Sequence, residues 1–489
     1  MSERDGYDLV CIGSGPAGQR AAVQAAKLGK RVAVVEKQRA LGGVCIETGT
    51  IPSKTFREAV RRFYSRPGLE SAGPGNLTAR PTMAQLVGHV GRVIEREIRT
   101  VQGALERNDV ELVRGRASFA DAHTVVVDTA DGRRRLKTAN VLIACGTRPS
   151  HPEGSAPDGE IIVTSDTVLG ISQLPRTMAV VGAGVIGIEY ASMFAALGVQ
   201  VTVIDGRARP LEFLDREITD ELVHQLRKRD VTMRCGEAVE RIDIAAAPHK
   251  KGLIRLDSGK HLVADVILIA AGRVGATEEL DLAAVGLAAD SRGRLTVDAS
   301  YRTSQPNIYA AGDVIGFPAL AATSSEQGRL AACHMFGMPA EAMGGHFPIG
   351  IYAIPELSTV GATEEELTRQ KVPYETGVAR YSEISRGQIQ GDDSGMFKMI
   401  FHRDTTKLLG VHCIGSGATE LVHVGQAVLT LGGGLDYFLK TVFNYPTLAE
   451  CYKVAAYNAA NKLALVRSLT GGGLLPAPPE VALVEQVAS

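Results

Sequence analysis

Two stretches of the chain repeat one hydrophobic pattern, at residues 8–36 and 178–205. Each begins with a short apolar run and a glycine-rich turn, continues into a helix that ends at Leu-Gly, and finishes with a β-branched run. This order predicts two strand–turn–helix–strand units. Between Met178 and Ile204 the single charged residue is Glu189, which superficially suggests a membrane span. The glycines that interrupt this apolar stretch favour the β-α-β interpretation instead.

The remaining pattern predicts further alternating helices and strands. Helices are expected near 42–64 and 83–107, with strands near 110–118, 123–128 and 139–144. A further strand is expected within 265–273, and another within 301–316, where it ends at Gly312-Asp313. Beyond residue 346 the pattern changes: strands near 396–402 and 407–414 alternate with helices near 417–431 and 447–468. A capping box, Thr363 with Glu366, predicts another helix start. An antiparallel sheet with helices, followed by a loosely ordered tail after about 470, is therefore expected.

Composition narrows the possible functions. The 489 residues include 53 basic and 54 acidic side chains, a net charge of −1, which gives no electrostatic reason to expect nucleic acid or membrane binding. The seven cysteines are scattered, without a CxxC pair, as in reduced thiols of a cytoplasmic protein. Their spacing indicates no metal site. The charged start, which leads directly into a strand, also predicts no secretory signal.

Both repeated units carry GxGxxG and end in an acid. In such turns the first glycine permits a tight turn, the second lets the backbone approach a pyrophosphate, and the third lets helix and strand pack closely. The terminal carboxylate can bind ribose hydroxyls. Matched register in two copies predicts two dinucleotide sites rather than ordinary turns of an α/β protein. The residues concerned are Gly13, Gly15, Pro16, Ala17, Gly18, Glu36 and Lys37 in the first copy, and Gly182, Gly184, Ile186, Gly187 and Asp205 in the second.

The second copy has cationic residues that the first lacks. Arg207 and Arg209 follow Asp205 closely, where a 2′-phosphate would lie. An acid favours NAD, whereas a nearby arginine accommodates NADP. The combination indicates tolerance of both nucleotides, with the alternative that the arginines are solvated loop charges.

These motifs, in this order, resemble the pyridine nucleotide–disulfide oxidoreductase family, which includes glutathione reductase and lipoamide dehydrogenase, over residues 7–467. The resemblance implies an α/β fold with two Rossmann-like domains, for FAD and NAD(P), and a C-terminal α+β dimerisation domain. The expected boundaries are 1–158 and 276–345 for the FAD domain, 159–275 for the NAD(P) domain, 346–470 for dimerisation and 471–489 for a flexible tail. Further cofactor-binding residues implied are Gly43, Val44, Cys45, Lys54, Gly146, Thr147, Gly272, Arg273, Gly312 and Asp313.

The family resemblance also implies an electrostatic pair beside the flavin N5, formed by Lys54 and Glu189. A cation there would stabilise negative charge on the reduced flavin, and a carboxylate partner would make burial of the lysine tolerable. The alternative is that Glu189 is an ordinary helix carboxylate.

Two departures from the family pattern remove disulfide chemistry. In GGVCIETGTIPSKT (42–55) the family's flavin-side thiol is replaced by Thr50, which leaves Cys45 alone. In FNYPTLAE (443–450) Tyr445 replaces the family's catalytic histidine, while Glu450 is kept. Tyrosine has an ordinary pKa near ~10 and is a poor proton shuttle for a thiol at neutral pH.

The implied activity is ping-pong, reversible hydride transfer from NADPH to NAD+ through one FAD. The substrates would be NADPH/NADP+ and NADH/NAD+, and the protein at least a homodimer whose active site the partner's C-terminal domain completes. Three alternatives stay open: a single-cysteine flavoprotein that reduces peroxide, oxygen or quinone, a lipoamide dehydrogenase-like diaphorase, and a non-catalytic nucleotide-sensing subunit. Cys45 is either a packed remnant or a thiolate that cycles through sulfenic acid. Tyr445 either caps a helix opened by Pro446 or handles protons.

Overall fold

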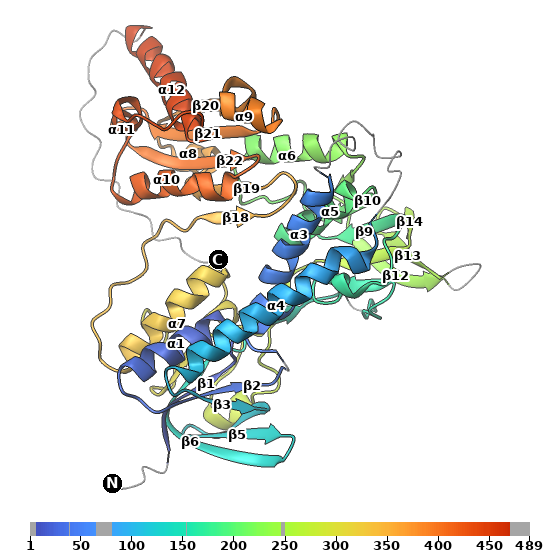
Figure 1. Cartoon of the computed structure of the whole chain (residues 1–489), viewed down its shortest axis with the longest axis vertical. Coiled ribbons are helices and arrows are strands. Elements are labelled where there is room, and N and C mark those ends of the chain that lie inside the picture. Colours follow the sequence, from blue (N-terminus) through green and yellow to red (C-terminus); the bar gives the residue numbers. More distant parts are fainter. Residues whose placement is uncertain (1–5, 39, 65–80, 153, 246–249, 470–489) are drawn as a thin grey trace. The chain divides into compact units, whose positions relative to one another are not determined.

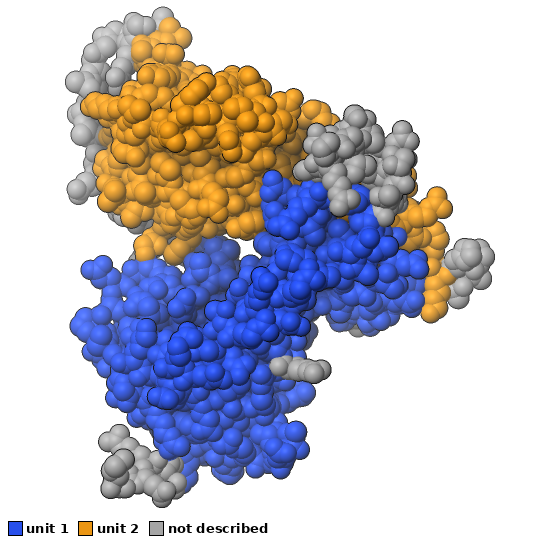
Figure 2. Space-filling view, viewed as in Figure 1, with its two compact units in different colours: residues 1–63, 81–174, 268–343 blue, residues 64–80, 175–267, 344–489 orange. Residues whose placement is uncertain are grey.

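The computed structural model describes residues 6–38, 40–64, 81–152, 154–245 and 250–469. Contacts divide the chain into two compact units (Figure 2). Unit 1 takes its described residues from 1–63, 81–174 and 268–343, and unit 2 from 64–80, 175–267 and 344–489. Unit 1 therefore joins segments that lie on either side of 175–267 in the sequence. The predicted domain boundaries stay predictions, and the predicted tail, 471–489, lies outside the described residues.

Unit 1 is a mixed α/β unit (Figure 1). Its helices are α1 (Pro16–Lys27), α2 (Gly43–Glu47), α3 (Thr50–Tyr64, whose last residue is assigned to unit 2), α4 (Met83–Glu106) and α7 (Ala321–Met335). Its strands are β1 (Tyr7–Ile12), β2 (Val32–Glu36), β3 (Glu111–Arg114), β4 (Arg116–Asp121), β5 (Thr124–Thr129), β6 (Gly132–Ile143), β7 (Thr147–Pro149), β8 (Ile162–Thr164), β16 (Arg273–Gly275) and β17 (Ile308–Ala310).

A parallel sheet organises unit 1 and determines where its site residues meet. Strands β3, β2, β1 and β6 are neighbours in that order, and β17 pairs with β6, all in parallel. In register, Ile12 lies beside Ile143, and Ile143 lies beside Ala310. Because parallel strands end at the same sheet edge, the turns after β1, β6 and β17 come together there. The N-terminal half of β6 continues into an antiparallel meander with β5 and β4.

Helices α1 and α7 pack against each other in unit 1 (Figure 1). The approach is close: a Cβ on Gly328 would lie 2.0 Å from the carbonyl oxygen of Ala17. Small residues on α1, among them Ala21, Ala22 and Ala25, are fully buried. This packing fixes the start of α1 above the sheet edge, which is where a dinucleotide turn requires it.

Unit 2 begins with a second parallel sheet. Its elements up to Ile267 are β9 (Thr177–Val181), α5 (Val185–Ala196), β10 (Gln200–Asp205), α6 (Arg216–Lys228), β11 (Thr232–Cys235), β12 (Val239–Ala245), β13 (Lys251–Leu256), β14 (His261–Ala264) and the start of β15 (Val266–Ile269). The order is β11-β10-β9-β15, with β9, β10 and β11 parallel. Strands β12, β13 and β14 form a separate antiparallel sheet. The apolar stretch that superficially suggested a membrane span is thus β9, α5 and β10.

The rest of unit 2 is an antiparallel sheet with helices, as the pattern predicted. Its order is β18-β19-β22-β21-β20. The elements are β18 (Ile349–Ile351), β19 (Leu357–Gly361), α8 (Glu364–Gln370), β20 (Tyr374–Arg380), α9 (Ser385–Gln390), β21 (Met396–His402), β22 (Leu408–Ile414), α10 (Ala418–Thr430), α11 (Leu435–Lys440) and α12 (Glu450–Leu469). Its core holds a stacked aromatic pair, Phe438 and Tyr452, with ring centroids 5.2 Å apart.

The structure confirms some local expectations and corrects others. The capping box is confirmed: Thr363 and Glu366 bond reciprocally at the start of α8. The strand expected over 110–118 is interrupted at Gly115, whose φ of +155° separates β3 from β4. The helix expected to open at Pro446 begins at Glu450 instead, so capping by Tyr445 was wrong. No helix in the described part of the chain is long and apolar enough to cross a membrane.

Candidate active site

The first glycine-rich turn has the geometry that its sequence predicted. Gly13 has φ +107°, a conformation that side chains disfavour. A Cβ on Gly15 would meet no atom within 4 Å, so the backbone at the start of α1 is open to a ligand. A Cβ on Gly18 would lie 1.9 Å from the carbonyl oxygen of Gly13, so only glycine permits this packing. An open backbone at the N-terminus of a twelve-residue helix fits the pyrophosphate of FAD.

The acid at the end of β2 is held against this turn. Glu36 is 4% exposed, and its Oε2 accepts hydrogen bonds from the backbone N and the hydroxyl of Ser14, at 3.0 and 2.6 Å. The same hydroxyl accepts a bond from the backbone N of Gly42 at 2.9 Å. Ser14 thus joins the turn, the acid and the segment leading to α2. Sequence reasoning missed Ser14, although its position inside GxGxxG was a usable signal.

The second turn reproduces these features in unit 2. Gly182 has φ +110°, a Cβ on Gly187 would lie 1.9 Å from the Gly182 carbonyl oxygen, and the backbone N of Ala183 donates to Asp205 Oδ2 at 2.5 Å. At Gly184 a Cβ would have one neighbour within 4 Å, the guanidinium of Arg207 at 3.9 Å. This turn also fits a dinucleotide, with a cation beside its open backbone.

Two arginines at the second site differ in how they are held. Arg207 makes a bidentate pair with Asp205, with Nε 2.9 Å from Oδ1 and Nη2 2.7 Å from Oδ2. Burial opposes ionisation of Asp205, but bonds from Arg207 and from backbone amides hold the pKa of this carboxyl below its usual range. Arg209 is held loosely, at 3.5 Å from Glu365 and 3.4 Å from the carbonyl of Glu212. Both arginines are thus paired with acids, while their side chains remain 45% and 31% exposed.

The sheet edge of unit 1 gathers residues from the turns after β6 and β17. Arg273 donates to the hydroxyl and the carbonyl of Thr147, both at 2.9 Å, and pairs with Asp166 at 3.0 Å. Burial raises the pKa of Asp313, and Arg273 offsets this only in part. The backbone N of Gly312 donates to Gln327 Oε1 at 2.8 Å. The positions of Asp166 and Gln327 were not predicted, because long-range contacts bring them here.

Cys45 lies on α2 and is partly buried. Burial raises the pKa of its thiol, while a hydrogen bond from the Thr50 hydroxyl acts in the opposite direction. Negative charges on Asp313 and Glu97 raise it further. The thiol is therefore protonated at neutral pH, which favours the packed remnant over the reactive thiolate. Gly43 packs its backbone against Gly15, since a Cβ there would lie 3.1 Å from the Gly15 Cα.

Lys54 and Glu189 occupy different units, and their pairing stays a prediction. Lys54 is half-buried on α3. Glu189 is 3% exposed on α5, and its Oε1 accepts a hydrogen bond from the backbone N of Tyr352 at 2.8 Å. The neighbouring hydroxyl of Ser192 accepts one from Ile354 at 3.0 Å. Glu189 is thus bonded to the segment that precedes β19 rather than being an ordinary surface carboxylate.

The C-terminal run presents an exposed tyrosine and an incompletely bonded glutamate. Tyr445 is 66% exposed, and its hydroxyl lies 2.6 Å from the hydroxyl of Ser385. One carboxylate oxygen of Glu450 is shielded from solvent and accepts no hydrogen bond from the described residues. The other predicted residues lie beside the turns: Pro16, Ala17 and Ile186 in the helix starts, Val44 in α2, and Gly146 and Gly272 in the turns after β6 and β15. Lys37 is paired with Glu279 at 2.9 Å.

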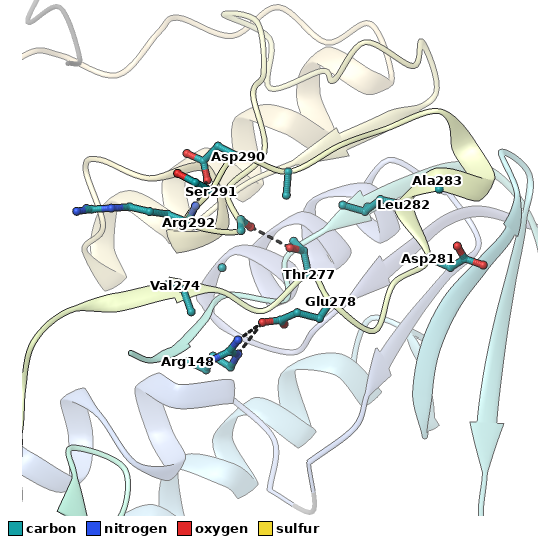
Figure 3. A pocket seen from close by; sticks show the side chains of 13 residues that line it. Arg148, Val274, Thr277, Glu278, Asp281, Leu282, Ala283, Asp290, Ser291 and Arg292 are labelled. Carbon is teal, nitrogen blue, oxygen red and sulfur yellow. Dashed lines mark hydrogen bonds and ion pairs between the residues drawn. The ribbon is translucent and has the colours of Figure 1, made fainter. Parts of the chain in front are cut away.

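A shallow pocket of about 470 Å³ in unit 1 does not coincide with these residues (Figure 3). Its lining includes the ion pair of Arg148 with Glu278, and Thr277, whose hydroxyl donates to the carbonyl of Gly293 at 3.0 Å. None of its lining residues belongs to a glycine-rich turn or to the segment around Cys45. Of its charged groups, Arg148 and Glu278 bond to each other, and the Asp290 carboxylate pairs with Arg294 at 2.9 Å.

One group of three carboxylates in the described part of unit 2 has metal-ligand spacing: Asp215, Glu217 and Glu364. The Lys398 ammonium lies among them, 2.9 Å from Asp215 and 3.0 Å from Glu217, and also bonds to Glu364. A protein cation thus occupies the place that a metal ion would take.

The chain belongs to the pyridine nucleotide-disulphide oxidoreductase family, whose pattern matches residues 7–328, and the dimerisation domain of that family matches residues 347–456. Proteins of Mycobacterium bovis and Mycobacterium tuberculosis, both named soluble pyridine nucleotide transhydrogenase, are 51% identical over 462 residues, covering 94% of this chain and 98% of theirs. A Photobacterium profundum protein of the same name is 44% identical, with the same shares of each chain covered.

Solved structures support the same family. The HOCl-induced flavoprotein disulfide reductase RclA from Escherichia coli is 26% identical, with a TM-score of 0.83 over 92% of this chain and 99% of that one. LpdA from Mycobacterium tuberculosis gives 25% identity and the same TM-score and shares covered. The predicted fold class, an FAD- and NAD(P)-binding α/β flavoprotein with a dimerisation domain, is therefore confirmed.

Proposed function

We propose that this protein is an FAD-dependent pyridine nucleotide transhydrogenase that moves hydride from NADPH to NAD+, and in reverse, without a disulfide. One observation carries the proposal. Thr50, whose hydroxyl is hydrogen-bonded to the Cys45 thiol, occupies the position at which a disulfide reductase needs its second thiol. The relatives named soluble pyridine nucleotide transhydrogenase support it. FAD, when bound, supplies a centre that accepts hydride from one nucleotide and returns it to another.

The second glycine-rich turn is the site at which the two nucleotides bind, one after the other. Gly182 and Gly184 shape the backbone for the pyrophosphate, and the N-terminus of α5 favours its charge. Asp205 is the acceptor for ribose hydroxyls, and Arg207 and Arg209 supply charge for a 2′-phosphate. One site with an acid and two arginines suits an enzyme that must accept both NAD(H) and NADP(H).

Lys54 and Glu189 form the proposed electrostatic pair beside the flavin ring. The half-buried position of Lys54 on α3, near Cys45, supports this placement. A cation there stabilises the reduced ring, so Lys54→Met slows reduction by NADPH at saturating nucleotide. Equal rates in the variant and the parent would remove the lysine from the mechanism.

The proposal also includes the assembly of the protein, its domain boundaries and its location. The protein is at least a homodimer, and the C-terminal run of one copy, with Tyr445 and Glu450, completes the partner's site. The shielded, unbonded oxygen of Glu450 supports a donor supplied from outside the described chain. The domains keep the boundaries given above, and the location is the cytoplasm, in keeping with seven free cysteines.

Anaerobic stopped-flow spectroscopy tests the function in two steps. NADPH first reduces the enzyme-bound flavin, then the reduced enzyme is freed of nucleotide and mixed with NAD+. Rapid reoxidation with formation of NADH is the expected result. Reduction followed by no response to NAD+, but fast reoxidation by peroxide, oxygen or a quinone, would replace the proposal with an oxidant-reducing flavoprotein.

A further inference from the structure

The loose pairing of Arg209 suggests a second residue that controls which nucleotide binds. Its guanidinium lies 3.5 Å from Glu365 Oε1, and the two side chains are 31% and 34% exposed. Ion pairs of this length and exposure are weak, and a phosphate group competes with them readily. By contrast, the bidentate bonds from Arg207 to Asp205, a side chain 7% exposed, are much harder to break.

Glu365 comes from α8, far along the chain from Arg209, yet both belong to unit 2. The preceding residue, Glu364, is fixed by Lys398, and its backbone N lies 3.4 Å from Asp215 Oδ2. The capping box fixes the following residue, Glu366. The first turn of α8 is therefore held in place, and Glu365 is presented to Arg209 by a rigid support.

The second carboxylate oxygen of Glu365 is shielded from solvent and accepts no hydrogen bond from the described residues. A carboxylate with an unsatisfied oxygen is not optimised as a structural bond. It does place a negative charge directly beside the arginine assigned to the 2′-phosphate.

We propose that Glu365 is a specificity-determining residue that stands in for the 2′-phosphate. With NAD(H) bound, Glu365 neutralises Arg209, which would otherwise be an unpaired cation. With NADP(H) bound, the 2′-phosphate takes Arg209 and leaves Glu365 as a nearby like charge. Glu365 thus lowers the preference for NADP(H) that Arg209 alone would give, and lets one site accept both nucleotides. The inference rests on the proposed function only in taking residues 205–209 as the ribose site.

Isothermal titration calorimetry on the FAD-loaded protein tests this without any hydride transfer. The probes are 2′,5′-ADP, which carries the 2′-phosphate, and 5′-AMP, which lacks it. Glu365→Gln is expected to tighten 2′,5′-ADP about two- to fivefold and leave 5′-AMP nearly unchanged, since one weak ion pair is removed. Arg209→Gln is expected to weaken 2′,5′-ADP at least about tenfold. Adding Glu365→Gln to it should tighten 2′,5′-ADP less than Glu365→Gln alone does, because only the repulsion between Glu365 and the 2′-phosphate is then relieved.

Asp220→Asn is the matched control. Asp220 lines the same shallow surface pocket as Glu365 and makes an ion pair of the same 3.5 Å length, but with Arg216. It should leave the ratio of the two affinities unchanged. The inference is overturned if Glu365→Gln leaves that ratio at the parental value, lowers it, or raises it no more than Asp220→Asn does. Glu365→Asp, which keeps the charge on a shorter arm, supplies the same comparison if the glutamine variant loses FAD or folds poorly.

The outcome is separable from that of the proposed function. Failure of NAD+ to reoxidise the flavin would refute the transhydrogenase reaction and leave these affinities as measured. Unchanged affinities with normal hydride exchange would remove Glu365 and keep the reaction.

Discussion

Lys398 is the clearest place to perturb the folded state of unit 2. Its side chain is fully buried, and its ammonium bonds to Asp215, Glu217 and Glu364. Burial acts to lower its pKa, but the three carboxylates outweigh this and raise the pKa. The substitution Lys398→Met keeps most of the side-chain volume and removes the charge. The carboxylates then lose their common partner.

The cost can be worked from the exposure of each acid. Asp215 is 1% exposed, whereas Glu217 and Glu364 are 49% and 32% exposed and can be solvated. One fully buried carboxylate is therefore left without its cation, for which removal of a partner typically costs about 3–5 kcal/mol. Asp215 keeps a bond from the backbone N of Glu217 at 3.2 Å, which places the expected loss at the lower end, about 3 kcal/mol.

Differential scanning calorimetry on FAD-loaded protein measures this loss. At roughly 2–4 °C per kcal/mol, the transition that contains unit 2 should fall by about 6–12 °C. Asp215→Asn, which preserves a good helix N-cap, provides the control. In the Lys398→Met background it should recover much of the lost Tm, because the uncompensated charge is then gone. A fall in Tm of less than about 2 °C, or no recovery in the double variant, would refute the electrostatic account.

The pH dependence of the Tm difference between the parent and Lys398→Met provides an independent test of this electrostatic account. Burial works against the charged form of Asp215, but His412 and Lys398 hold its pKa below the usual range. The parent therefore has this stabilisation at all pH values above the ordinary carboxyl range and loses it as the pH falls below that range. Without Lys398 the pKa of the Asp215 carboxyl rises. As the pH is lowered, Asp215 is therefore protonated at a higher pH in the variant than in the parent, and its uncompensated buried charge is removed. The difference in Tm between parent and variant should shrink as the pH is lowered from 7 toward 5, and a constant or growing difference would contradict the assignment.

Three further outcomes are expected. Gly187→Ala should abolish flavin reduction by either nucleotide while FAD stays bound, because the new Cβ would lie 1.9 Å from the carbonyl oxygen of Gly182. Stopped-flow reduction of the flavin is the measurement. Gly88→Ala, whose new Cβ would have no atom within 4 Å, is the control. Cys45→Ser should keep most of the NADPH-to-NAD+ exchange rate in a steady-state assay, and loss of that exchange would return the thiol to the mechanism. Thr50→Cys should not yield a good reductase of glutathione or lipoamide, since the C-terminal run still lacks the family's histidine; rapid turnover with either disulfide would show otherwise.

The sequence by itself determined the two glycine-rich turns and the presence of Thr50 in place of a second cysteine near Cys45. Local backbone requirements explain why: a positive φ at Gly13 and Gly182, and close contacts at Gly18 and Gly187, admit only glycine and repeat at a fixed spacing. Helix and strand order also follows from hydrophobic period, a local property of the chain. The replacement at Thr50 is visible because the residues around it keep their pattern.

Only the tertiary structure decided which side chains from distant parts of the sequence contact each other around these turns. Arg273 meets Asp166, and Arg209 meets Glu365 across 156 positions of the sequence, contacts that no local spacing encodes. The raised pKa of Cys45 likewise depends on burial and on charges brought in by packing. Hydrophobic period and backbone conformation act between near neighbours in the chain, whereas ion pairs and desolvation depend on distances that exist only once the chain has folded.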